Sequence, residues 1–325
     1  MRRILSLGKR ILRRLLQIVM LSDILYKTEW YKNLFVDHQI YPDNFWYRDH
    51  EERNYDLVNI GSSSAKWAFY YDDLGVKAMN WAQQPQTLLE DFNLLRTYHS
   101  VLRKKGYVLI TVMPFTGLNK ETGIYDAIKY LKLDTQGEAI EPILFDKAMR
   151  YAKYPILFGR PAISALVRYV MRKEVKNTCI EKWNRNGNPL SDEELKADAK
   201  RWMANWKAQF KIADIEKPLT NENQKGREYR IKLMRKMIDF CIERDYQPVL
   251  IIPPVTEYLA KELTPKFCQI YVYDYLEQVE RNMKILDYSK EKMLMDKDLF
   301  MNSFFMNRRG AKAFTERVLK DLRLI

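Results

Sequence analysis

The chain has 325 residues, 47% of them hydrophobic, which suffices for one large α/β domain or two smaller ones and excludes a disordered chain. Its formal net charge of +13 favours an anionic partner, such as a phospholipid surface, an acidic glycan or nucleic acid. No zinc-finger, helix-turn-helix or ribonucleoprotein pattern is present, so we do not expect a nucleic-acid partner.

The residue types that most often hold metals are few and scattered. They are Cys179, Cys241, Cys268, His38, His50 and His99. No two cysteines have the spacing of a metal knuckle, and no two histidines lie one helical turn apart. We therefore expect no metal and no cofactor, and we expect reduced thiols, as in a cytoplasmic protein.

Residues 1–26 predict a basic amphipathic helix. Arginine or lysine occurs six times in residues 2–14, no acid precedes Asp23, and apolar residues recur at helical spacing. The apolar run after Arg14 is shorter than the roughly 20 residues that span a bilayer, and no signal-peptide cleavage pattern follows it. Two interpretations stay open: residues 2–19 lie on the inner face of the membrane, or the helix packs on the domain with its arginines in water.

Residues 27–325 predict a single α/β domain organised around Tyr55–Ser64. This stretch indicates a short buried strand that ends in a tight turn at Gly61, followed by a helix. One interpretation is that the serines of the turn cap the helix. The other is that the turn offers a nucleophile and an oxyanion site at the carboxyl edge of a sheet.

Further strands and helices alternate along the chain. The predicted strands are 75–80, 107–113, 248–254 and 285–288, and the predicted helices are 87–105, 192–210, 221–244, 267–282 and 309–322. We expect Gly106 to end the second helix of the domain. The alternation indicates a parallel sheet with helices on both faces.

A helical insertion is expected at about 125–215, covering the carboxyl edge of the sheet as a lid. Ser191 and Glu194 predict a capping box that opens its last helix. Trp202, Trp206 and Phe210 recur every four residues on one face of that helix. Such a stripe is usually core, although here it can line a cleft.

With these elements, the chain resembles the SGNH (GDSL-like) hydrolase superfamily over roughly 55–322. The nearest branch contains the D-alanine-transfer protein of teichoic acid synthesis and bacterial polysaccharide O-acyl enzymes. The resemblance implies a flavodoxin-like three-layer sandwich with about five parallel strands. It places Ser63 at the nucleophile position, with Ser62 and Ser64 as register alternatives.

The second and third blocks of the resemblance lack expected residues. Met79–Pro85 resembles the block that normally supplies an oxyanion glycine, and it contains no glycine. Val108–Asn119 resembles the block that normally holds Gly-x-Asn-Asp, for which Asn119 is a loose substitute. The resemblance leaves as oxyanion or cleft residues Gly61, Ser62, Ser64, Gln84 and Asn119.

The last block keeps the asparagine and the Gly-Ala pair of the family pattern but lacks its catalytic aspartate and histidine. The family pattern Asp-x-x-His, followed by Asn and Gly-Ala, corresponds here to Asn302, Phe305, Asn307 and Gly310-Ala311. Phenylalanine cannot remove a proton from serine, and asparagine cannot supply the charge that supports an imidazolium. Loss of the base costs a serine hydrolase on the order of a millionfold, or about 8 kcal/mol of barrier.

Two functions follow from this resemblance. The first is an SGNH-like protein of bacterial surface polysaccharide synthesis or modification that lacks a working triad and acts by binding or assembly, with an acylated or anionic glycan as its partner. The alternative is an active acyl-ester hydrolase or O-acyltransferase that uses Ser63 with His38, His50 or His99 as its base. The first predicts a protein that does not react at Ser63, and the second predicts an imidazole near it.

Overall fold

The computed structural model describes residues 53–84, 86–118, 146–147, 150, 178–279 and 282–325. The chain divides into two compact units, Met1–Asp49 with Gly123–Asn177 and His50–Thr122 with Thr178–Ile325, and nearly all described residues belong to the second. Several predictions concern residues outside the described part of the chain. These are the helix at 1–26 with its membrane contact at residues 2–19, most of the insertion, and the residues His38, His50 and Asn119.

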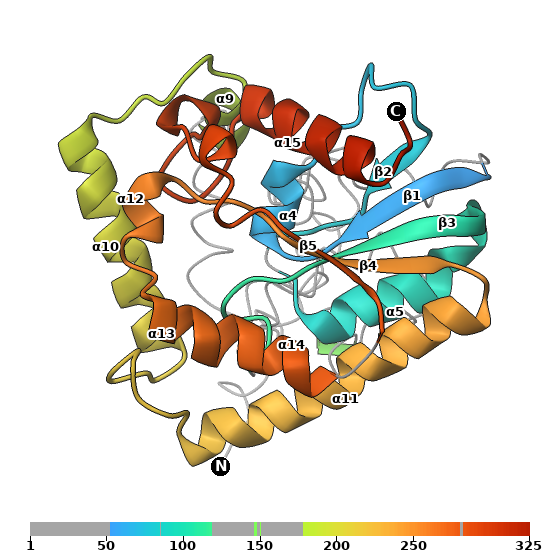
Figure 1. Ribbon diagram of the computed structural model, residues 1–325, viewed down its shortest axis with the longest axis horizontal. Coiled ribbons are helices and arrows are strands. Elements are labelled where there is room, and N and C mark those ends of the chain that lie inside the picture. Colours follow the sequence, from blue (N-terminus) through green and yellow to red (C-terminus); the bar gives the residue numbers. More distant parts are fainter. Residues whose placement is uncertain (1–52, 85, 119–145, 148–149, 151–177, 280–281) are drawn as a thin grey trace, which may run out of the picture. The chain divides into compact units, whose positions relative to one another are not determined.

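The second unit is built on a five-stranded parallel sheet (Figure 1). The strands are β1 (Tyr55–Ile60), β2 (Ala78–Asn80), β3 (Leu102–Thr111), β4 (Gln247–Ile252) and β5 (Lys284–Asp287). Their order, β2-β1-β3-β4-β5, is that of a flavodoxin-like sheet. The prediction of an α/β fold with about five parallel strands is confirmed.

Helices cover both faces of the sheet. On one side lie α4 (Ser63–Ala68) and α15 (Arg308–Asp321), and on the other lie α5 (Leu88–Tyr98) and α11 (Asn221–Glu243) (Figure 1). The α15 side is an apolar core in which Leu57, Leu109 and Ile251 of the sheet pack with Phe314 and Val318. Alternate residues of buried strands face opposite layers, which is why the apolar runs of the sequence fill both sides.

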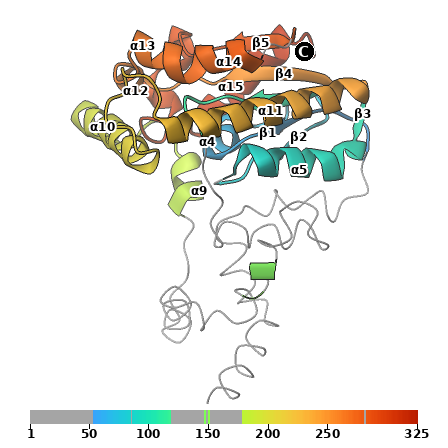
Figure 2. The same cartoon turned by 90° about the horizontal axis from the view of Figure 1, so that it is seen from below.

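The remaining helices lie mainly toward one end of the sheet (Figures 1 and 2). They are α9 (Thr178–Trp183), α10 (Asp192–Gln209), α12 (Glu257–Ala260) and α13 (Pro265–Cys268), with the π-helical segment Gln269–Tyr273 and α14 (Asp274–Val279). Single 3₁₀ turns occur at His99–Val101, Lys292–Leu294 and Lys297–Leu299. The loops after β3 and β4 meet α10, α12 and α13 in a second apolar cluster that includes Leu118, Trp206 and Val255.

The helix starts follow the local sequence closely. Helix α10 begins after Ser191, whose hydroxyl accepts from the Glu194 N–H at 3.3 Å while the Glu194 carboxylate accepts from the Ser191 N–H at 2.8 Å. This confirms the predicted capping box and the helix 192–210, and it places the helix in the same compact unit as the sheet. The extent of the insertion, 125–215, stays a prediction.

The prediction that a helix runs to Lys105 and ends at Gly106 is wrong. Helix α5 ends at Tyr98, and Gly106 lies inside β3, which begins at Leu102. Pairing explains the difference: Tyr55 lies opposite Leu102, but Leu57 lies opposite Tyr107, so the residues between form a bulge with Lys105 at φ 59°. The predicted helix 267–282 is likewise interrupted by its π-helical segment.

Candidate functional site

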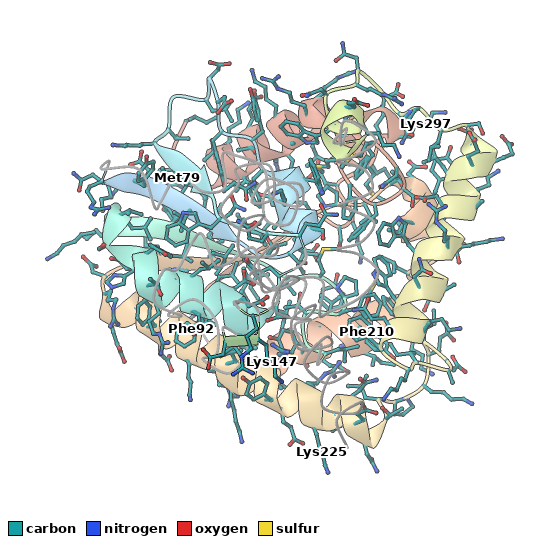
Figure 3. The ribbon with its side chains drawn as sticks, turned by 180° about the vertical axis from the view of Figure 1, so that it is seen from behind. Met79, Phe92, Lys147, Phe210, Lys225 and Lys297 are labelled. Atoms are coloured by element: carbon teal, nitrogen blue, oxygen red, sulfur yellow. The ribbon has the colours of Figure 1, made fainter. Side chains whose placement is uncertain are left out.

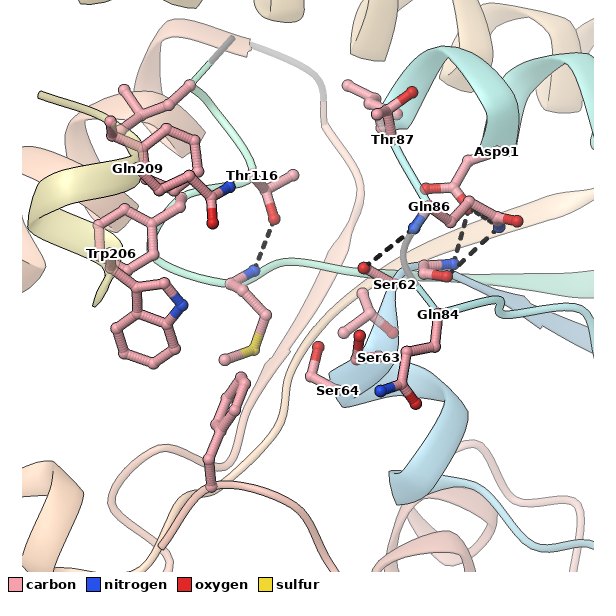
Figure 4. Close-up of a pocket in the computed structure, with 18 of the residues that line it drawn as sticks. Ser62, Ser63, Ser64, Gln84, Gln86, Thr87, Asp91, Thr116, Trp206 and Gln209 are labelled. Atoms are coloured by element: carbon pink, nitrogen blue, oxygen red, sulfur yellow. Dashed lines mark hydrogen bonds between the residues drawn. The ribbon is translucent and has the colours of Figure 1, made fainter. Parts of the chain in front are cut away.

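A cavity of about 300 Å³ lies where the carboxyl ends of β1 and β3 meet. From β1 the chain proceeds to β2 on one side, and from β3 to β4 on the other, so this is the point where the strand order reverses. Ligands of open α/β sheets bind at such switch points. The Gly61–Ser64 turn forms one wall (Figure 4).

Gly61 is required at the turn by both conformation and space. Its φ is +139°, a region that side-chain-bearing residues rarely adopt, and a Cβ here would lie 2.8 Å from the Ala65 Cβ and 3.0 Å from the Thr111 Cβ. The prediction that Gly61 permits the tight turn is confirmed. The same closeness brings Thr111, the last residue of β3, into the wall of the cavity.

The serines have different partners. Ser62 is the N-cap residue of α4, but its side chain makes no capping bond; its Oγ accepts from the Gln86 N–H at 3.2 Å. Ser63 and Ser64 face the interior of the cavity beside Gln84 (Figure 4). The Gln84 Oε1 accepts from the Trp67 indole N–H at 2.9 Å, which fixes its side chain at the rim. The turn therefore offers hydroxyl groups to a ligand.

A buried carboxyl group anchors the turn from behind. The Asp91 Oδ1 accepts from the Gly61 N–H at 2.8 Å and from the Gln86 Nε2 at 2.5 Å. Burial raises the pKa of Asp91 to about 7, and the nearby Glu90 charge adds to this rise, while the Gln86 and Gly61 hydrogen bonds and the Arg230 charge oppose it. Asp91 therefore changes its protonation state near neutral pH. The Gly61 N–H donates to Asp91 and is not directed at a ligand.

The opposite wall is aromatic. It consists of Trp202 and Trp206 from α10, Phe210 directly after it, Phe115 from the loop after β3, and Phe304 and Phe305. The rings contact one another: Trp202 and Phe305 have centroids 5.3 Å apart, and Trp206 and Phe304 5.0 Å apart. The predicted aromatic stripe thus serves both as core and as cavity lining.

The last block of the resemblance brings only one of its two degenerate positions to the cavity. Phe305 lines it together with Ser63, whereas Asn302 is outside the lining formed by the described residues. The Asn302 Oδ1 accepts from the N–H groups of Phe304 and Phe305 at 2.8 and 2.7 Å. Asn302 therefore shapes the turn that presents the two phenylalanines.

The preserved frame of this block has a structural explanation. The Asn307 Oδ1 accepts from the Gly310 N–H at 2.9 Å and so caps α15, while its Nδ2 donates to the Asp298 carbonyl at 2.8 Å. A Cβ on Gly310 would lie 2.0 Å from the Leu299 carbonyl oxygen. Both residues are needed to fold the loop onto α15, whatever chemistry the loop carries.

His99 is too far from the serines to act as their base. It lies just before β3, and its Nδ1 is 3.0 Å from the Tyr246 hydroxyl. The cavity lies beyond the other end of β3, at a distance on the order of 20 Å or more for a strand of this length. The alternative that uses His99 is wrong; those that use His38 or His50 concern residues outside the described part of the chain.

Several polar residues that complete the cavity were not predicted from the sequence. They are Gln86, Thr87, Asp91, Thr111, Thr116, Gln209 and Arg230. The Thr111 Oγ is buried and has no hydrogen-bond partner among the described residues, so it remains available to a ligand. Thr111 could have been predicted, because it ends a strand of a parallel sheet and ligands bind at the carboxyl ends of such strands. No local sequence pattern indicates Asp91 or Arg230.

Within the described ranges, no group of three or more histidine, cysteine, aspartate or glutamate side chains is arranged to hold a metal ion. No helix among those described combines the length and the apolar character needed to cross a bilayer. In comparisons with known proteins, no family model matched the chain and no curated protein was similar to it. The fold and the cavity define a flavodoxin-like α/β protein with a ligand-sized cavity at the switch point of its sheet.

Proposed function

We propose that this protein binds an acylated glycan in the cavity, without Ser-His-Asp hydrolysis, in bacterial surface polysaccharide synthesis or modification. The observation that carries the proposal is the position of Phe305, in the wall of the same cavity as Ser63. The SGNH resemblance assigns the catalytic base to this position. A phenyl ring there can contact a ligand but cannot take the serine proton.

The two walls of the cavity suit such a ligand. Hydroxyl and amide groups of Ser63, Ser64 and Gln209 can exchange hydrogen bonds with sugar hydroxyls, and Thr111 has a buried hydroxyl without a partner among the described residues. The aromatic rings opposite can cover an acyl group or the apolar face of a sugar ring. Apolar walls with a few fixed polar groups are typical of small-molecule sites.

The groups near the turn support binding rather than nucleophilic catalysis. Asp91 holds the turn through its Oδ1, which accepts from Gly61 and Gln86, and it forms no hydrogen bond with a serine hydroxyl of the turn. A general base must reach the proton that it removes, directly or through one water. Arg230 also lines the cavity, and its positive charge favours an anionic glycan.

The first test is reaction with a fluorophosphonate probe. We expect the folded wild-type protein to show no labelling that depends on Ser63, with Ser63→Ala as the matched control. Labelling that disappears in Ser63→Ala would instead establish an activated serine, and the proposal of a non-catalytic site would be abandoned. The search for the base would then turn to His38 and His50.

The second test measures binding by calorimetry. We expect an O-acetylated oligosaccharide to bind more tightly than the same oligosaccharide after deacetylation. Trp202→Ala should weaken binding about tenfold or more, equivalent to about 1.4 kcal/mol. Phe92→Ala is the control, because Phe92 is an aromatic residue of α5 that packs on Phe240 away from this cavity (Figure 3). Equal weakening by both changes, or no preference for the acylated form, contradicts the proposal.

A further inference from the structure

A second, larger cavity of about 630 Å³ lies at the carboxyl ends of β4 and β5. Its floor is apolar, with contributions from the loop after β4, from α13 and its π-helical continuation, and from the segment after β5. The main floor residues are Ile252, Pro253, Val255, Leu263, Val272 and Met295. All of these except Leu263 are buried.

The rim of this cavity is cationic. Lys261, Lys290 and Lys292 line it and are exposed, and Glu257 is the one acidic residue in the described lining. None of the three lysines forms a salt bridge within the described part of the chain. The Lys261 ammonium lies 5.8 Å from the centroid of the Tyr258 ring, and the charges of Lys290 and Lys292 are available to a ligand at the mouth.

We propose that this cavity binds an anionic amphiphile, with its alkyl chain on the apolar floor and its carboxylate or phosphate group at Lys290 and Lys292. This site is independent of the proposed function of the first cavity. Its volume lies within the 300–1,000 Å³ range that is typical of small-molecule sites, roughly double that of the first cavity. The apolar floor favours a hydrocarbon chain, and the lysines supply the charge complement of its head group.

Two other occupants, the basic N-terminal segment and a neutral sugar, fit this cavity less well than an amphiphile. The basic segment at residues 2–14 has apolar residues that suit the floor, but its arginines and lysines would be repelled by the lysine rim. A neutral sugar would leave the floor uncovered and the lysines without counter-charge. An alkyl chain with one anionic end satisfies both parts of the cavity at once.

Calorimetry with a series of alkyl carboxylates tests the proposal. With octanoate, decanoate and dodecanoate, each below its micelle concentration, we expect affinity to rise about fourfold per methylene until the chain fills the floor. Dodecanol, which has the chain without the charge, should bind about tenfold more weakly than dodecanoate. Dodecyl phosphate distinguishes the source of the head group: tighter binding than dodecanoate indicates a lipid phosphate, and weaker binding a fatty acid.

The rim is tested with Lys290→Gln combined with Lys292→Gln. We expect dodecanoate binding to fall about tenfold while dodecanol binding stays the same. Lys225→Gln is the control, an exposed lysine of α11 outside the cavity (Figure 3). An affinity that does not depend on chain length, or an equal loss in the control, would overturn the proposal.

A covalent measurement gives an independent readout. Cys268 lines the cavity and is partly exposed, so dodecanoate should slow its alkylation by a neutral maleimide, measured by peptide mass spectrometry. The rate in the rim variant should respond only at correspondingly higher dodecanoate concentrations. Alkylation of Cys268 that is unaffected by saturating dodecanoate would show that the ligand binds elsewhere.

Discussion

The backbone N–H of Gly61 donates to the buried carboxylate of Asp91 at 2.8 Å, across 30 residues of sequence. This bond ties the turn after β1 to α5, on the far side of the sheet from α4. Because Asp91 is buried, its ionisation is costly, and its pKa rises to about 7. The rigidity of the candidate site and its response to pH therefore depend on the same residue.

Asp91→Asn should flatten the dependence of stability on pH. The pKa of Asp91 is raised from its ordinary value of 3.8 to about 7, so the folded state holds its proton more tightly than the unfolded state. The resulting stability is fully present below about pH 4 and is lost as the pH rises to about 7. Between pH 4 and pH 8, the unfolding free energy of Asp91→Asn should gain up to about 4 kcal/mol relative to wild type.

Urea unfolding at several pH values measures this effect. Asparagine keeps an oxygen that can accept from Gly61 and Gln86, so the variant should fold. Asp72→Asn, at an exposed position, should follow the wild-type profile. Parallel profiles for Asp91→Asn and wild type would show that Asp91 does not titrate in this range.

Gly310→Ala should destabilise the protein by about 3 kcal/mol, because the new methyl group collides with the Leu299 carbonyl rather than with a movable side chain. Arg309→Ala, at the exposed neighbouring position of the same helix, should change the unfolding free energy by less than about 0.5 kcal/mol. Similar midpoints for both variants in thermal or urea unfolding would contradict the close approach of α15 and the loop before it.

The double variant Asn302→Asp with Phe305→His should make Ser63 reactive. An aspartate keeps oxygen acceptors for the N–H groups that Asn302 now receives, and the imidazole enters the wall of the serine cavity. A positioned base contributes on the order of 100-fold or more, so fluorophosphonate labelling should accelerate by at least about that factor over wild type. The labelling should vanish when Ser63→Ala is added.

The outcome shows whether the site lacks only the catalytic base or also holds residue 305 too far from Ser63. A folded double variant that remains unlabelled would show that residue 305 does not face Ser63 closely enough for proton transfer. The inertness of the wild type would then have a steric cause in addition to the missing imidazole.

The two described free cysteines with placed side chains should differ in thiol reactivity. Cys241 is fully buried, and burial raises the pKa of its thiol to about 12, so the reactive thiolate is scarce and inaccessible. Cys268 is partly exposed, and although burial raises its pKa, the nearby Lys290 charge opposes the rise. Iodoacetamide at pH 8 should modify Cys268 well before Cys241, and urea should remove the difference.

Local signals predicted the elements that depend on local chemistry. The strand at Tyr55–Ile60, the turn at Gly61 and the helix start at Ser191 all follow from residues within a few positions of one another. The end of α5 was mispredicted because Leu102 continues the helical apolar spacing. Its strand conformation comes from pairing with Tyr55, which lies 47 residues earlier.

The residues of the candidate site likewise fall into two groups, those that a local pattern predicts and those that only the packing of helices brings to the cavity. The serine turn and the aromatic stripe of α10 were visible in the sequence because each forms a short pattern. Asp91 and Arg230 reach the cavity from α5 and α11, and only the packing of these helices brings them together. No spacing along the chain records that packing, so these residues required the structure.

Among the described residues, the sheet ends on both sides in short strands, β2 with three residues and β5 with four. At the β5 edge, Lys284 is exposed and donates to the Asp321 carbonyl at 2.6 Å. Short edge strands give an incoming chain little backbone to pair with, and a charged residue such as Lys284 at the β5 edge opposes pairing further. Concentrated solutions of this protein should therefore resist strand-mediated fibril formation despite its five parallel strands.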